Sequence, residues 1–169
     1  MNFFTKLEDA ATSNNSRLCI GLDPHPSRLP PGISVEQFNR EIIETTADLV
    51  CAYKPNFAFY EALGAAGYHA LRNTIAAIPQ YIPVIADAKR GDIGSTSTAY
   101  AVSIFEELDC DAITVNPYMG YDSLKPFLDY EEKGVFILCR TSNPGSEDFQ
   151  TLRIEGEEGL PLYQLVARK

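Results

Sequence analysis

Short apolar runs alternate along the chain with longer segments in which apolar residues recur at helical spacing. The runs predicted as strands are 18–22, 51–57, 82–86, 112–117 and 135–139. The segments predicted as helices are 3–13, 34–50, 61–78, 94–108, 121–132 and 160–169. Strands that alternate with helices are typical of a parallel sheet, because each parallel connection needs a crossover. The pattern predicts one α/β domain over residues 1–169.

Polar residues follow the predicted strands, at the point where each strand ends. They are Asp23, Lys54, Asp87 with Lys89, Asn116 and Ser142. Right-handed crossovers place all these strand ends on the same side of the sheet. In a barrel every strand end surrounds one mouth, whereas in an open sheet only the ends beside the switch point line a site. Polar residues after every strand therefore favour a TIM (β/α)8 barrel.

The length of the chain limits how much of a barrel it forms. A complete TIM barrel typically has about 250 residues, and this chain has 169. We therefore expect a truncated barrel of five parallel strands, incomplete at its C-terminus. An open, flavodoxin-like sheet that binds a ligand or a partner protein is the alternative.

The third predicted strand leads into a segment rich in charge. Asp87 and Lys89 are two residues apart, so in an extended backbone their side chains share a face and Arg90 points away. The hydroxyls of Ser95 and Thr96 are expected to cap the next helix. Two opposite charges at the end of a buried strand fit either a structural ion pair or a catalytic pair.

Composition excludes several classes of partner. The formal net charge is −9 and the pI is about 4.7, which argues against nucleic acid and anionic membranes as partners. No apolar run is long enough for a signal peptide or a membrane span, so we expect a cytoplasmic protein. The widely spaced cysteines predict neither a disulfide nor a metal site. Asp109 and Asp111 are interpreted as a solvated turn rather than as metal ligands.

Five segments, taken in order, resemble motifs of the orotidine 5'-phosphate decarboxylase family in its longer bacterial type. They are Leu22–Pro24, Tyr53–Asn56, Asp87–Thr96, Val115–Gly120 and Thr141–Gly145. Related sugar-phosphate decarboxylases share the D-x-K-x-x-D pattern of the third segment, and some of them use Mg2+, for which Asp23 and Asp87 are possible ligands. Lys54, within Lys-Pro-Asn, distinguishes the first family from these relatives.

The resemblance implies a homodimer of TIM barrels that converts orotidine 5'-phosphate to uridine 5'-phosphate in pyrimidine synthesis, without metal or organic cofactor. Asp23 and Lys54 would bind the ribose hydroxyls. Asp87 would lie beside the substrate carboxylate, and Lys89 would protonate the ring carbon. Asn116 and Ser142 are further substrate-binding residues by this resemblance, with Ser142 bonding the pyrimidine.

The resemblance also implies a site shared between subunits. Asp92, Ile93 and Thr96 would reach into the neighbouring subunit, where Asp92 completes the catalytic row of lysines and aspartates. The family normally continues through three more β-α units, which would carry the phosphate-binding residues. We therefore expect this chain alone to be weakly active or inactive.

Overall fold

The computed structural model describes residues 1–156 and 159–169, and its sheet is built from five short parallel strands. They are β1 (Cys19–Leu22), β2 (Ala52–Pro55), β3 (Ile85–Arg90), β4 (Ala112–Val115) and β5 (Gly134–Ile137). β1 pairs with β2, and β4 pairs with both β3 and β5. Isolated bridges join β2 to β3, at Tyr53 with Val84 and at Asn56 with Asp87.

The strand order decides between the two predicted architectures. The strands lie side by side in the order in which they occur in the sequence. A flavodoxin-like sheet has the order 2-1-3-4-5, with a switch point between strands. The flavodoxin-like alternative is therefore wrong, and the truncated α/β barrel with five parallel strands is confirmed.

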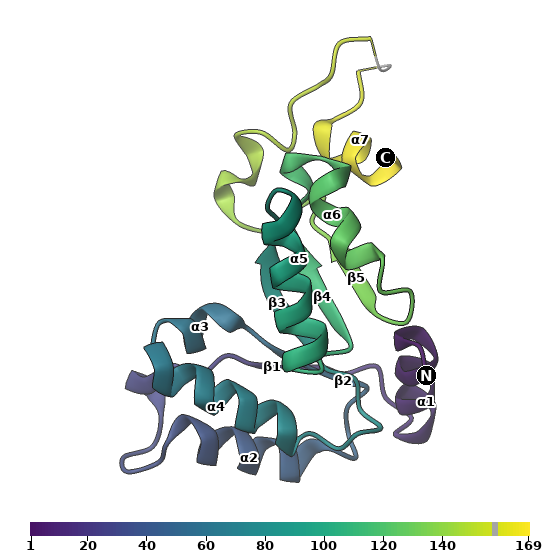
Figure 1. Cartoon of the computed structure of the whole chain (residues 1–169). Helices are drawn as coiled ribbons and strands as arrows, with labels where there is room; N and C mark the ends of the chain where they lie inside the picture. The colour runs from purple at the N-terminus through teal and green to yellow at the C-terminus, as the bar shows by residue number, and fades with distance from the viewer. Residues whose placement is uncertain (157–158) are drawn as a thin grey trace.

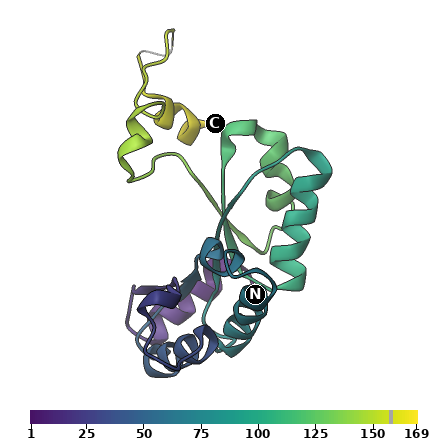
Figure 2. The same ribbon diagram turned by 90° about the vertical axis from the view of Figure 1, so that its left-hand side faces the viewer.

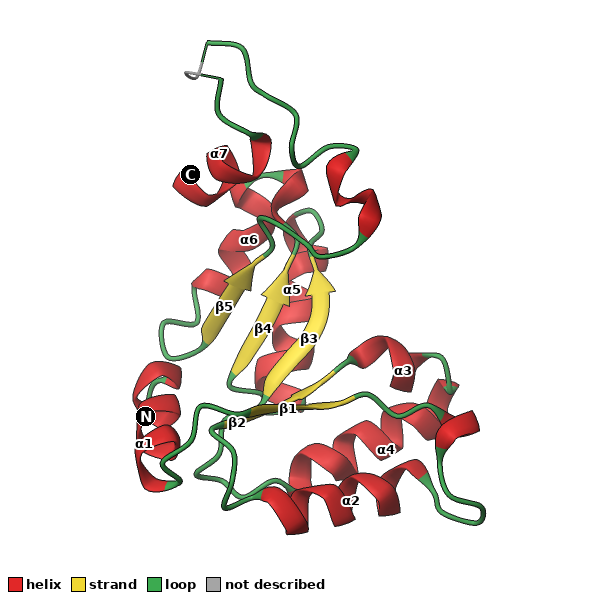
Figure 3. Ribbon diagram, turned by 180° about the vertical axis from the view of Figure 1, so that it is seen from behind, coloured by secondary structure: helices red, strands yellow, loops and turns green. Residues whose placement is uncertain are grey.

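Helices cover one face of this curved sheet and lie across the two ends of its strands (Figures 1 and 2). They are α1 (Phe3–Ser13), α2 (Val35–Thr46), α3 (Phe57–Glu61), α4 (Gly64–Ala77), α5 (Gly94–Val102), α6 (Tyr121–Leu128) and α7 (Leu162–Arg168). A π-helical turn, Ser103–Glu107, continues α5. α2 and α4 lie along β1 and β2, while α5 and α6 lie behind β3 to β5 (Figures 1 and 3). No helix in the described part of the chain is long and apolar enough to cross a bilayer.

The burial of alternate strand residues shows which face is the core. Leu22, Tyr53, Ala86 and Ile113 point toward the helices and are almost fully buried. On the other face, Gly21 is exposed and Phe136 is 44% exposed. The segment that follows β5, with α7, lies beyond the carboxyl ends of β3 to β5 (Figures 1 and 2).

The predicted helices are in place, but several of their limits differ. The capping box of Ser34 and Gln37 forms, yet α2 ends at Thr46 rather than near residue 50, and Leu49 is 53% exposed. α5 begins after Ile93 with no side-chain cap, so the predicted capping by Ser95 and Thr96 is wrong.

Ser97 supplies the hydrogen bonds at the start of α5 instead. Its hydroxyl accepts from the Asp92 N–H at 3.1 Å and is 2.8 Å from the Ser123 carbonyl, to which it donates. Ser97 is fully buried, so it joins the start of α5 to α6 inside the protein. The Ser97 hydroxyl therefore holds the Asp92 backbone, just before α5, against α6, and α5 itself begins without a side-chain cap.

α1 closes the amino ends of the strands through Phe3. The ring of Phe3 packs with Ala52, Ile85 and Ala112, and its N–H donates to the Glu132 carbonyl at 2.8 Å. A Cβ on Gly134 would lie 2.4 Å from the Phe3 ring, so the close approach requires glycine. Gly134 is the first residue of β5, so this contact seats α1 at the start of that strand.

α1 also pairs with a charged residue whose predicted environment is wrong. Asp111 was expected in a solvated turn, but it pairs with Lys6 at 2.8 Å and accepts the Val84 N–H at 2.8 Å. Asp111 therefore joins α1, β3 and β4, as a structural residue.

Candidate active site

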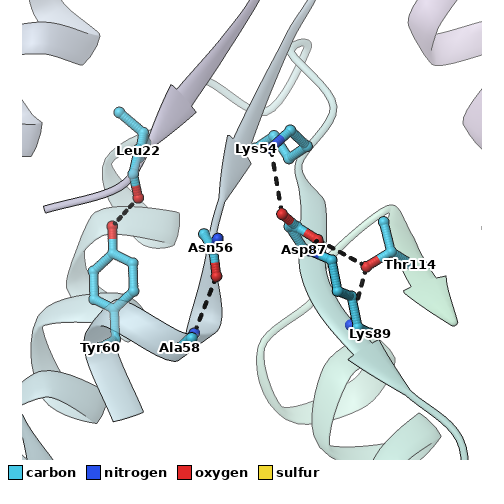
Figure 4. A network of polar contacts seen from close by, with 8 residues as sticks. All are labelled: Leu22, Lys54, Asn56, Ala58, Tyr60, Asp87, Lys89 and Thr114. Carbon is cyan, nitrogen blue, oxygen red and sulfur yellow. Dashed lines mark hydrogen bonds and ion pairs between the residues drawn. The ribbon is translucent and has the colours of Figure 1, made fainter. Parts of the chain in front are cut away.

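Charged side chains from two strands and a hydroxyl from a third converge on Asp87 (Figure 4). Lys89 Nζ lies 2.6 Å from Asp87 Oδ1, and Lys54 Nζ lies 3.5 Å from Asp87 Oδ2. The Thr114 hydroxyl donates to Asp87 Oδ1 at 3.0 Å. The sequence analysis predicted that Lys54, Asp87 and Lys89 share one end of the sheet, and the structure brings these three residues together.

A bulge in β3 places Lys89 in this cluster. Ala86 pairs with Ile113, but the next paired residue on β3 is Arg90, opposite Val115. Between these two pairs, the three residues 87–89 of β3 lie opposite the single residue Thr114 of β4, so the ladder is interrupted over a stretch that includes Lys89. Lys89 has a φ of +48°, a left-handed conformation that a side chain other than glycine rarely adopts.

Arg90 points to the other face, as the alternation predicts. Its guanidinium pairs with Glu61 and lies 5.1 Å from the centre of the Tyr100 ring. It also donates to the Ala88 carbonyl at 3.2 Å. Arg90 therefore holds β3 against the helical layer and leaves the opposite face to Asp87 and Lys89.

The charges around Asp87 keep its carboxylate ionised. Burial alone would raise the pKa of Asp87, but hydrogen bonds from Lys89 and Thr114, together with the charges of Lys89 and Lys54, lower it below its ordinary value. Two ammonium groups then surround one carboxylate, which leaves the cluster with one net positive charge. A positive cluster at the sheet end of a protein with a net charge of −9 suits an anionic ligand.

Three of the predicted substrate-binding residues lie at strand ends outside this cluster. Asp23 directly follows β1 and is exposed. Asn116 follows β4, and its side-chain oxygen accepts the Tyr118 N–H at 3.0 Å, so it caps a short turn. Ser142 is exposed after β5 and lines a hollow with Arg140 and Asn143.

The residues predicted to serve a neighbouring subunit lie between β3 and α5. Asp92 Oδ1 accepts the Ile93 N–H at 2.7 Å, so this carboxylate is held by its own loop. Ile93 is 61% exposed and Thr96 is exposed on the first turn of α5. Within the described part of the chain, none of the three makes a hydrogen bond or an ion pair with Lys54, Asp87 or Lys89.

A buried network supports the end of β1, just before Asp23. The Tyr60 hydroxyl donates to the Leu22 carbonyl at 3.0 Å and accepts from Asn39 Nδ2 at 2.9 Å (Figure 4). Asn39 also donates to Thr74 at 3.0 Å. Burial raises the pKa of Tyr60 well above its ordinary value, so it remains a neutral donor.

Thr114 is the contact that the sequence analysis missed. It was treated only as part of an apolar strand, although it is polar and lies two residues before Asn116. Residues two apart in a strand share a face, so Thr114 lies on the same face as Asn116. This spacing would have predicted that Thr114 points toward the site at the strand ends.

The fold and the site together define a class: an α/β-barrel protein with a charged site at the carboxyl ends of its strands, where barrel enzymes carry their active sites. Comparison with known proteins is more specific. The family model described as orotidine 5'-phosphate decarboxylase / HUMPS family matches residues 16–159, and the chain belongs to this family.

Individual relatives agree with this assignment. The chain is 59% identical to orotidine 5'-phosphate decarboxylase of Herpetosiphon aurantiacus over 99% of its length, and 57% identical to that of Dehalococcoides mccartyi over 100%. It spans 65% and 63% of those two proteins. Among solved structures, OMP decarboxylase of Leishmania donovani is 47% identical with a TM-score of 0.88, over 99% of this chain and 64% of that one.

Proposed function

We propose that this chain carries the catalytic residues of an orotidine 5'-phosphate decarboxylase of pyrimidine synthesis, a carboxy-lyase, within one α/β-barrel domain. The observation that carries the proposal is the cluster of Lys54, Asp87 and Lys89, with its short Lys89–Asp87 pair. The family assignment and the named relatives support it.

The reaction explains why these residue types stand together. The bond between the pyrimidine ring and its carboxylate breaks, carbon dioxide leaves, and the electron pair remains on the ring carbon. The ring has no neighbouring electron sink, so a fixed cation is needed to stabilise the developing charge. The Lys89 ammonium supplies that charge and then transfers a proton to the ring carbon.

Asp87 contributes through a difference between substrate and transition state. Its charge lies beside the substrate carboxylate and repels it, and this repulsion disappears as neutral carbon dioxide forms. The low pKa of Asp87 keeps that charge present near neutral pH.

The remaining roles follow the family resemblance. Asp23 and Lys54 bind the ribose hydroxyls, and Asn116 and Ser142 bind the substrate, with Ser142 at the pyrimidine. In a homodimer, Asp92, Ile93 and Thr96 enter the partner's site; their position on an exposed loop and helix start supports this role. The enzyme class supports a cytoplasmic location.

The contacts of Asp87 argue against the magnesium-dependent alternative. Asp87 Oδ1 is occupied by Lys89 and Thr114, and Oδ2 faces Lys54. A metal ion bound at Asp87 would have to displace two ammonium groups. We therefore propose cofactor-free chemistry for this site.

The proposal is tested by extending this chain to the full length of its relatives. Residues 1–169 are joined to the C-terminal segment of the Herpetosiphon aurantiacus relative, and loss of orotidine 5'-phosphate is followed by ultraviolet absorbance. We expect turnover in the chimera, little in the 169-residue chain, and about a hundredfold to thousandfold loss on Lys89→Ala, the range that follows the loss of one stabilising group at the reacting centre.

Matched measurements decide the result. Lys125→Ala removes an exposed lysine of α6 that pairs with Asp129 and takes no part in the cluster around Asp87. This variant should leave turnover unchanged. Circular dichroism confirms that each variant is folded. A folded chimera without activity, or a folded Lys89→Ala chimera with near-normal turnover, would overturn the proposal.

A further inference from the structure

The Thr114 hydroxyl makes two hydrogen bonds that meet at the cluster. It accepts the main-chain N–H of Lys89 at 3.0 Å and donates to Asp87 Oδ1 at 3.0 Å. One side chain on β4 thus contacts the backbone of one charged residue and the carboxylate of the other (Figure 4).

The hydrogen bond from the Lys89 N–H to Thr114 takes the place of a ladder hydrogen bond that the β3–β4 pairing does not provide. The bulge between Ala86 and Arg90 takes Lys89 out of the regular β3–β4 ladder. Its left-handed φ of +48° is unfavourable for lysine, and such a conformation persists only where surrounding contacts hold it. The Thr114 hydroxyl gives the Lys89 N–H a partner in this conformation.

The second bond fixes the carboxylate to which Lys89 is paired. Asp87 Oδ1 lies between the Thr114 hydroxyl and the Lys89 ammonium, 2.6 Å from the latter. The hydroxyl can make both bonds at once because it has one proton to donate and lone pairs that accept. Valine has the same shape without either capacity.

We infer that Thr114 is a positioning residue, whose hydroxyl holds the Asp87 carboxylate and the Lys89 backbone in one arrangement and so aims the Lys89 ammonium at the reacting carbon. The catalytic part of this inference rests on the proposed function. The structural part, the coupling of Thr114 to Asp87, holds for the chain by itself.

The structural part is tested in the 169-residue chain without substrate. The Asp87 carboxyl carbon is titrated by NMR in the parent chain and in Thr114→Val and Thr114→Ser variants. Loss of a hydrogen bond to the carboxylate raises its pKa, so we expect the Asp87 titration to move to higher pH in the valine variant. The serine variant, which keeps the hydroxyl, should titrate like the parent.

The catalytic part is tested in the chimera. With Thr114→Val, kcat should fall about tenfold with KM changed less than about threefold, as expected when one hydrogen bond that orients a catalytic group is lost. Thr114→Ser should restore kcat. Thr98→Val is the matched control, because the Thr98 hydroxyl bonds only within the exposed surface of α5, to Gly94 at 3.3 Å.

The outcomes separate this inference from the proposed function. An unchanged Asp87 titration in Thr114→Val, or an equal shift in the serine variant, would overturn the coupling. Should the valine variant not fold, Thr114→Ala replaces it under the same criteria. A chimera that is inactive in its parent form contradicts the proposed function, while the titration still decides the coupling.

Discussion

The sharpest stability prediction concerns the Tyr60 hydroxyl. Tyr60→Phe keeps the ring, which is fully buried between α3, α2 and β1, and removes only the oxygen. The Leu22 carbonyl then loses its donor at 3.0 Å, and one N–H of Asn39 loses its acceptor at 2.9 Å. No solvent reaches these groups to replace the hydroxyl, because Asn39 is only 1% exposed.

The magnitude follows from the two groups left without partners. A buried polar group without a partner costs about 1–3 kcal/mol, so two of them lower the free energy of unfolding by about 3 kcal/mol. For a chain of this size, each kcal/mol lowers the melting temperature by about 2–4 °C, so a decrease of about 6–12 °C is expected. That is a large fraction of the total stability of a typical domain, which is about 5–15 kcal/mol.

Urea unfolding followed by circular dichroism measures this difference directly. Tyr118→Phe is the matched control, since Tyr118 is 91% exposed and its substitution should change stability by less than about 0.5 kcal/mol. The prediction is refuted if Tyr60→Phe shifts the urea midpoint no more than Tyr118→Phe does, and if the slope of the unfolding free energy against urea is the same in both variants.

Two further predictions address other parts of the fold. The pKa of Asp87 is lower in the folded chain than its ordinary value of 3.8, so the stability that its ionisation contributes is present above pH 3.8 and is lost as the pH falls through the lower folded value. In acid unfolding, Asp87→Asn should lose less stability over this pH range than the parent chain does. An identical pH profile for the two chains would contradict the prediction. Phe3→Ala should lower the free energy of unfolding by about 3–5 kcal/mol, because the ring is 2% exposed, whereas Phe4→Ala, at a 67% exposed position, should lower it far less in the same urea experiment.

The sequence predicted the features that depend on local patterning. Apolar runs located every strand, and the positions of Lys54, Asp87 and Lys89 at strand ends predicted that they would meet. The separation of Arg90 from Asp87 and Lys89 also followed from alternation alone. These features succeed because strand periodicity and parallel connections fix which side chains share an edge.

The features that failed depend on contacts between distant segments. The left-handed Lys89 arises from an uneven pairing of β3 with β4, which no residue in the segment encodes by itself. Asp111 appears solvated in the sequence because its partner Lys6 lies 105 residues away. Ser97 is buried against α6, a long-range contact that the local sequence around α5 does not reveal.

The sequential strand order, with α1 packed across the amino ends of the strands, has a consequence for how the chain folds. Neighbouring strands are also successive in the sequence, so each pairing closes a loop of only one crossover, which costs less chain entropy than closing a longer loop. The Phe3 contacts are different, since the Phe3 N–H bonds to Glu132, between α6 and β5, and so joins segments separated by four strands. We expect the strands to pair first and α1 to pack against their amino ends last, fixing the curvature of the sheet.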